Sequence, residues 1–170
     1  MEKTNKSREK LIKRCEILEK IIMSISDSYF SKETTNDQKK LLETVLGAAI
    51  WYLPHNQTYW TGKISKVAKE TLEQNCKSSL TKEHQFPRKI AAKELLQMKD
   101  KLAKKEVSLV QLYENKYAKY NLVTPQENKK LAQFQREHEF NDVETAYIKA
   151  KVELIEITQE ELRLLKKVKN

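Results

Sequence analysis

Glycine is scarce in this chain, and its scarcity excludes several fold classes at once. Gly47 and Gly62 are the only glycines among 170 residues, and proline occurs three times. Sandwiches with many tight turns, and loops that wrap phosphate groups, need glycine where the backbone adopts positive φ. We therefore expect neither an all-β sandwich nor a glycine-rich α/β nucleotide-binding fold. The length fits a single domain, which we place over residues 1–170.

Apolar residues recur at three- and four-residue steps over much of the chain, which is typical of amphipathic helices. This spacing predicts helices over residues 7–25, 37–53, 63–75 and 108–117, one from Pro87 to residue 102, and a turn around 143–147. Capping boxes at Thr124–Glu127 and Thr158–Glu161 predict two further helix starts. Short strands are expected just after residue 78, over 120–124 and over 152–157. The predicted fold class is mainly α (α+β): a helical domain with a small two-stranded β element.

Positive charge is concentrated in the middle of the chain. The formal net charge is +9, and residues 61–135 alone contribute +8, whereas residues 1–60 contribute +2 and residues 136–170 contribute −1. A regional excess of lysine favours a polyanionic partner, because each neutralised phosphate releases counterions. We therefore expect nucleic acid, DNA or RNA, as the partner. A solvated lysine-rich surface or an acidic protein partner would give the same charge pattern.

The cysteines and the apolar runs indicate the compartment. Cys15 and Cys76 lie far apart and match no cysteine-based zinc or disulfide framework. No apolar run reaches the ~18 residues of a membrane span, and the first residues lack the apolar core of a signal peptide. These features predict a cytoplasmic protein with no membrane partner. The apolar stripe of residues 7–25 would also suit a homo-oligomer or a partner protein.

One constellation in the basic segment carries candidate chemistry. Glu83 and His84 follow a predicted strand, Asn121 lies near the start of the next one, and Asn128 lies one turn into the following helix. This order resembles the HNH group of ββα-metal (His-Me finger) nucleases over residues 79–132. In that group an acid–His pair ends the first strand, and an Asn or His on the helix ligates a divalent metal. The connection from His84 to Asn121 is longer than in that group, so the resemblance implies a ββα-metal core with a helical insertion.

The resemblance implies a role for each residue. His84 would be the general base, with Asn121 orienting its imidazole and Arg88 binding phosphate. Glu83 and Asn128 would ligate a divalent metal, expected to be Mg²⁺. Positive side chains next to these residues would bind the nucleic-acid backbone: Lys82, Arg88, Lys89, Lys129 and Lys130. The implied activity is metal-dependent endonucleolytic hydrolysis of phosphodiester bonds, in a defence or mobile-element system.

Three alternatives to this activity remain open. The first is a non-catalytic, basic helical module that binds nucleic acid, alone or within a larger complex. The second is a metal-free ribonuclease, with His84 as base beside Glu83 and Arg88. The third is purely structural: Glu83 complements a helix dipole, His84 packs against an aromatic ring, and Pro87 opens a helix. Whether the protein is an enzyme is therefore not decided by the sequence.

Two further patterns bear on the site. The segment is similar to small bacterial proteins that pair Glu-His-x-x-Pro-Arg-Lys with a later Val-Thr-x-x-Glu-Asn. This similarity implies that one structural unit holds Glu83, His84, Pro87, Arg88, Glu127 and Asn128. His55 lies among aromatic residues that predict a small core under a loop, and His138 lies in a charged run that predicts a solvated side chain.

Overall fold

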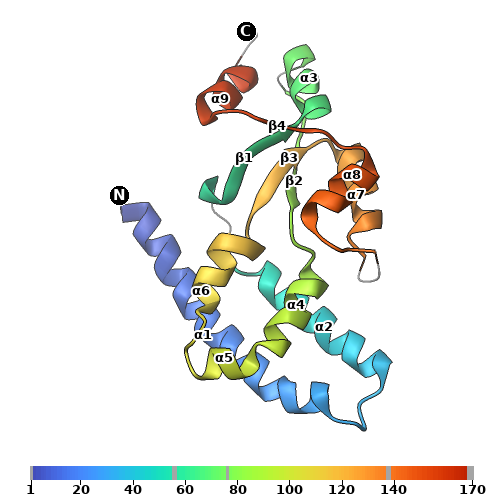
Figure 1. The fold of residues 1–170 in the computed structure, drawn as a ribbon. Coiled ribbons are helices and arrows are strands. Elements are labelled where there is room, and N and C mark those ends of the chain that lie inside the picture. The colour runs from blue at the N-terminus through green and yellow to red at the C-terminus, as the bar shows by residue number, and fades with distance from the viewer. Residues whose placement is uncertain (1, 55–56, 76, 137–138, 168–170) are drawn as a thin grey trace. The chain divides into compact units, whose positions relative to one another are not determined.

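The chain forms two compact units that are interleaved in sequence. The computed structural model describes residues 2–54, 57–75, 77–136 and 139–167. The helical unit comprises Met1–Asn56 and Phe86–Ala118, and the sheet unit comprises Gln57–Gln85 and Lys119–Asn170 (Figure 1). These units do not coincide with the segments of different net charge, residues 1–60, 61–135 and 136–170. Each unit has its own buried core and is described by itself below.

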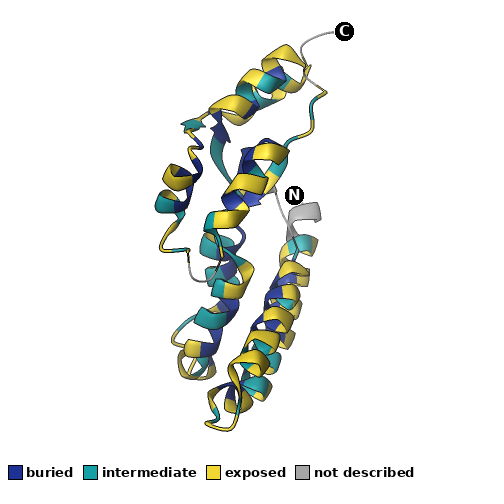
Figure 2. Cartoon of the chain, turned by 90° about the vertical axis from the view of Figure 1, so that its right-hand side faces the viewer, coloured by how far each residue is buried: buried dark blue, intermediate teal, exposed yellow. Residues whose placement is uncertain are grey.

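Amphipathic helices build the helical unit. Its elements are α1 (Glu2–Phe30), α2 (Asn36–Trp51), α4 (Arg88–Gln97), α5 (Lys99–Ala103), α6 (Leu109–Leu112) and the π-helical turn η2 (Tyr113–Tyr117). The buried side of α1 repeats every three or four residues through Leu11, Cys15, Leu18 and Ile22 (Figure 2). The Cys15 thiol is 1% exposed. Burial, together with the charge of Glu19, raises the pKa of this thiol to about 12.

Gly47 sets how closely α2 and α4 approach each other. A Cβ atom at this position would lie 3.2 Å from the carbonyl oxygen of Arg88 and 3.3 Å from its carbonyl carbon. Those atoms belong to the backbone, which cannot rotate away as a flexible side chain can. Glycine therefore permits a helix–helix contact here that any larger residue would push apart.

The sheet unit contains four strands and the helices that flank them. The strands are β1 (Trp60–Ser65), β2 (Thr81–His84), β3 (Tyr120–Val123) and β4 (Leu154–Glu156). Their order is β2-β3-β1-β4, with β3 antiparallel to β2 and parallel to β1, and with β4 antiparallel to β1. The other elements are the 3₁₀ turn η1 (Gln57–Tyr59), α3 (Lys66–Gln74), α7 (Pro125–Phe134), α8 (Val143–Ala150) and α9 (Gln159–Lys167).

The mainly helical α+β fold class is confirmed, but the sheet is larger than predicted. β1 begins in a polar, aromatic segment, and its last three residues lie where a helix was expected to start at residue 63. Ile64 is a buried strand residue rather than part of the helical stripe, and the Ser65 side chain caps α3 instead. Gly62 has a φ of 83°, and the pairing of β1 with β3 is irregular between Trp60 and Ile64. Because of this irregular backbone, β1 lacks the regular alternation of apolar and polar residues by which a strand is predicted from sequence.

The two strands predicted near the constellation do pair. β2 and β3 run antiparallel, with Glu83 opposite Asn121 and His84 opposite Tyr120, and α7 follows β3 directly. The capping box predicted at the start of α7 is present, with the Thr124 side chain and Glu127 bonded reciprocally. Along the chain, residues of the helical unit lie between β2 and β3. The nuclease resemblance itself stays a prediction.

One face of this sheet packs on α7 and α8. The core there consists of Val123, Leu131, Tyr147, Ala150 and Val152. Figure 1 shows α7 and α8 together beside the strands. Across the described part of the chain, every helix is too short or too polar to cross a lipid bilayer.

Candidate functional site

Glu83 and His84 point to opposite faces of the sheet. They are consecutive residues of β2, and side chains alternate between the two faces of a strand. Glu83 shares its face with its cross-strand partner Asn121, and His84 shares the other with Tyr120, whose ring centroid lies 6.1 Å from that of the imidazole. The structure therefore does not bring the predicted base and the predicted carboxylate together.

Glu83 belongs to a buried chain of polar side chains. The Tyr147 hydroxyl donates a hydrogen bond to Oε2 of Glu83, and Gln135 Nε2 donates to Oε1. Asn121 Nδ2 in turn donates to the Tyr147 hydroxyl over 2.9 Å, and Oδ1 of Asn121 accepts from the Thr61 hydroxyl. Glu83 is 2% exposed and Asn121 is fully buried. Asn121 thus orients Tyr147 rather than the imidazole of His84.

The environment of Glu83 favours its protonated form. Burial raises the pKa of this carboxyl group to about 7, and the hydrogen bonds from Tyr147 and Gln135 only partly oppose the shift. Burial and the adjacent carboxylate also raise the pKa of the Tyr147 hydroxyl. A carboxyl group that titrates near neutral pH marks a candidate functional residue, although buried structural networks shift pKa values in the same way.

The predicted metal ligands do not form a site that fits Mg²⁺. Both oxygens of Glu83 already accept hydrogen bonds, and a hard cation needs several deprotonated or carbonyl oxygens around it. Asn128 is half-buried on α7. Within the described ranges, no group of three or more His, Cys, Asp or Glu residues could hold a metal ion.

The predicted phosphate-binding residues are divided between the two units. Lys82, Lys129 and Lys130 are exposed side chains of the sheet unit. Arg88 and Lys89 begin α4 in the helical unit, where the Arg88 guanidinium lies 3.4 Å from the centroid of the Trp51 ring. The single unit implied for Glu83 through Asn128 is divided likewise, since Pro87 and Arg88 belong to the helical unit.

The aromatic residues near His55 do not form one small core. Trp51 and Tyr52 are 41% and 73% exposed, whereas Tyr59 is 8% exposed. His55 and His138 themselves lie outside the described residues, so their predicted roles stay predictions.

A groove between the sheet and α9 gathers positive and aromatic side chains. We call it the α9 groove; it has a volume of about 340 Å³ and is lined by Trp60, Lys82, Tyr120, Leu122, Gln159, Leu162, Arg163 and Lys166. Lys82 Nζ lies 5.2 Å from the centroid of the Tyr120 ring. Cations from one strand and one helix thus border a floor that is mainly aromatic and aliphatic.

Half of the residues that line this groove lie on α9, which carried no predicted site residue. Arg163 and Lys166 lie in the C-terminal segment, whose net charge of −1 gave no signal. Their spacing of three residues was the available signal, because it places both side chains on one face of a helix. The groove also depends on β1, which was not predicted. Of the predicted phosphate-binding residues, only Lys82 lines it.

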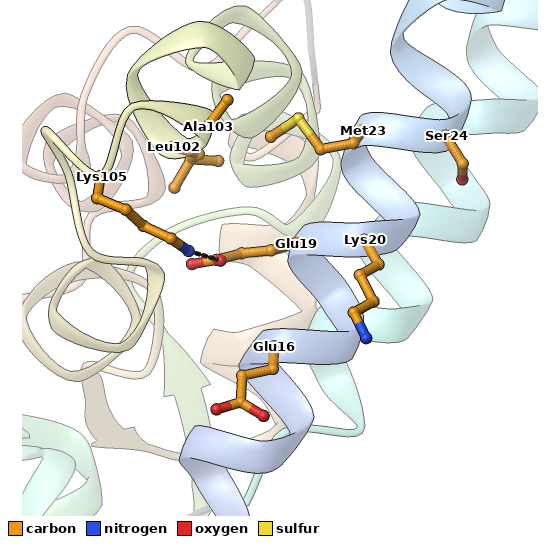
Figure 3. A pocket seen from close by; sticks show the side chains of 8 residues that line it. All are labelled: Glu16, Glu19, Lys20, Met23, Ser24, Leu102, Ala103 and Lys105. Carbon is orange, nitrogen blue, oxygen red and sulfur yellow. Dashed lines mark hydrogen bonds and ion pairs between the residues drawn. The ribbon is translucent and has the colours of Figure 1, made fainter.

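The helical unit has a pocket of its own, between α1 and the end of α5. Its walls carry both signs of charge, and Lys105 forms an ion pair with Glu19 beside Met23 and Leu102 (Figure 3). The four charged residues of this pocket, Glu16, Glu19, Lys20 and Lys105, sum to zero charge. The α9 groove is instead lined by three cations, of which Arg163 forms an ion pair with Glu160 over 3.1 Å.

Comparison with protein-family models, with curated proteins and with solved structures finds no match for this chain.

Proposed function

We propose that this protein binds nucleic acid through the α9 groove of its sheet unit. The observation that carries the proposal is the convergence of Lys82, Arg163 and Lys166 around Trp60 and Tyr120. Single-stranded nucleic acid is bound by such a combination, in which cations follow the backbone and aromatic rings contact bases. The net charge of +9 adds long-range attraction for a polyanion.

The proposal can be tested by removing the three cations of the groove together. Binding of a fluorescein-labelled single-stranded oligonucleotide is measured by anisotropy over a series of salt concentrations. The variant Lys82→Ala/Arg163→Ala/Lys166→Ala should bind more weakly. Its plot of log K against log salt should be shallower by about 2, since each phosphate contact on a single strand contributes about 0.7.

A charge-matched control separates the groove from net charge. Lys10→Ala/Lys32→Ala/Lys40→Ala removes the same charge from exposed positions of the helical unit. We expect this control to retain the wild-type slope. Equal losses in both variants would mean that binding is diffuse and would overturn the groove proposal.

A second candidate function, phosphodiester cleavage, is favoured by the position of His84. His84 and Lys82 are two residues apart on β2, so both side chains lie on the sheet face that carries the groove. An imidazole on that face lies on the same side of the sheet as a bound backbone, and histidine is the side chain that most often acts as a general base. This candidate needs neither Glu83 nor Asn121, which face the opposite side.

Cleavage of plasmid DNA and of total RNA, with Mg²⁺ or Mn²⁺ and with a chelator, tests this second function. His84→Ala should abolish cleavage and leave oligonucleotide binding unchanged. Loss of cleavage in the chelator would indicate a metal bound elsewhere than at Glu83 and Asn128, and survival of cleavage would support metal-free chemistry. Wild-type protein that binds but does not cleave would reject the enzyme and leave the binding module.

A further inference from the structure

A second pocket of the sheet unit lies where β2 begins and β3 ends. It has a volume of about 600 Å³, and its polar lining includes Thr71, Ser78, Ser79, Glu127, Lys130 and Lys151. Thr124, which also lines it, comes two residues after Leu122 of the α9 groove, a distance of about 7 Å along a strand. We call it the α7 pocket, because it is bounded by the first turn of that helix.

Glu127, which lines this pocket, has a carboxylate whose two oxygens differ in their hydrogen bonding. The residue is 6% exposed, and Oε2 accepts from the Ser65 hydroxyl over 2.5 Å and from the Thr124 amide and hydroxyl over 2.9 Å each. All hydrogen bonds recorded for this carboxylate within the described residues converge on that one oxygen. Oε1 is thus left as an acceptor held in place by a rigid cap, in a residue that lines the pocket.

The charges around this acceptor have a definite pattern. Lys130 and Lys151 are exposed lysines that line the same pocket, so the lining carries two cations and one carboxylate. Lys151 ends α8 in the left-handed conformation, with a φ of 54°. A ligand that suits this lining has an anionic group for the lysines and a hydrogen-bond donor for the carboxylate.

We propose that the α7 pocket binds a ribose–phosphate unit, and therefore that the nucleic acid is RNA. The phosphate would lie between Lys130 and Lys151, and the ribose 2′-hydroxyl would donate to Oε1 of Glu127. A carboxylate that accepts from a ribose hydroxyl is a general mode of ribose recognition, and the 2′-hydroxyl is the group by which proteins distinguish RNA from DNA. This inference rests on the proposed nucleic-acid binding.

Three probes of one sequence test the inference without altering the protein. They are single-stranded RNA, DNA and 2′-O-methyl RNA, composed of adenine and cytosine only so that the bases are identical. The wild type should bind RNA about tenfold more tightly than either of the other two, because neither offers a 2′ donor. Equal binding of all three, with normal salt dependence, would overturn the inference and leave the proposed function intact.

Glu127→Gln then tests the residue itself. Glutamine also completes a capping box, so its oxygen can stay on the Thr124 amide while its amide nitrogen faces the pocket. The variant should bind RNA as weakly as DNA and should leave DNA affinity unchanged. An unchanged preference for RNA in folded Glu127→Gln protein would exclude this carboxylate as the discriminating group.

Lysine variants test the phosphate half without touching the cap. Lys130→Ala and Lys151→Gly should each weaken RNA binding several-fold, and glycine suits the left-handed backbone of residue 151. Lys129→Ala is the matched control, because Lys129 is an exposed neighbour on α7 that does not line the pocket. Equal effects of Lys129→Ala and Lys130→Ala would contradict a localised phosphate site. If the wild type binds none of the probes, the proposed function itself fails.

Discussion

At the scale of single residues, Glu83 holds a proton that an ordinary glutamate would release. Its pKa is raised from 4.5 to about 7, chiefly by burial. In the unfolded chain the carboxyl group loses its proton at lower pH, so between the two pKa values the folded protein binds more protons. Stability from this group is therefore full below pH 4.5 and is lost as the pH rises through 7.

We expect the free energy of unfolding of the sheet unit to fall by about 3 kcal/mol between pH 4.5 and pH 8 because of Glu83. Glu83→Gln should remove this decrease, since a neutral amide has nothing to titrate. Urea unfolding in a Trp51→Phe background, where Trp60 is the only tryptophan, reports on the sheet unit. Parallel pH profiles for the two proteins would contradict the assignment.

At the scale of elements, the contact between α2 and α4 depends on the absence of a side chain. Gly47 is buried on α2, and its neighbour Ala48 is exposed on the same helix. The two positions differ in burial while sharing helical geometry. They separate the effect of close packing from that of helix propensity, which favours leucine over glycine.

Gly47→Leu should destabilise the helical unit by about 3 kcal/mol, because a leucine side chain would displace the backbone of Arg88. Ala48→Leu should change the free energy of unfolding by less than about 0.5 kcal/mol. Urea unfolding followed by far-ultraviolet circular dichroism measures both. Similar losses at the two positions would show that α4 can move aside.

At the scale of the whole molecule, the segment Phe86–Ala118 leaves the sheet unit and returns to it at neighbouring positions. The Gln85 amide donates to the Lys119 carbonyl over 3.1 Å, directly beyond the paired residues His84 and Tyr120. A gap of this size is spanned by a two-residue turn between antiparallel strands. The pairing of β2 with β3 therefore does not require the long segment Phe86–Ala118 that connects them.

A shortened chain of residues 57–85 joined through Asn-Gly to residues 119–170 should fold cooperatively. Asparagine and glycine supply the positive φ angles of a tight hairpin turn, and the core on α7 and α8 is contained in these residues. Thermal unfolding followed by Trp60 fluorescence is the measurement. A direct fusion of Gln85 to Lys119 is the control. It should be less stable, because Gln85 and Lys119 would then have to form the turn themselves, and neither residue favours the positive φ that such a turn needs.

The sequence predicted those elements whose signals are local. The capping boxes at Thr124 and Thr158 and the strand at Tyr120 were confirmed because their patterns lie within a few neighbouring residues. β1 was missed because its pairing with β3 joins residues 60 positions apart, and Gly62 interrupts its alternation. Non-local pairing of this kind leaves little trace in local composition.

The candidate site was predictable only in part, for a similar reason. The motif drew attention to Glu83 and His84 as one pair, but pairing with β3 as a regular strand separates them to opposite faces. The cations on α9 and the acceptor of Glu127 became candidates only once the fold had placed them beside pockets.

The burial of Cys15 makes its thiol a natural probe of local unfolding in the helical unit. A thiol reacts with alkylating reagents as its thiolate, and this one is 1% exposed with a pKa of about 12. Alkylation at neutral pH therefore requires local unfolding of α1, and the alkylation rate measures how often this unfolding occurs. With Cys76→Ser as background, mass spectrometry of the labelled chain would time local unfolding of α1 under native conditions, with no probe introduced into the core.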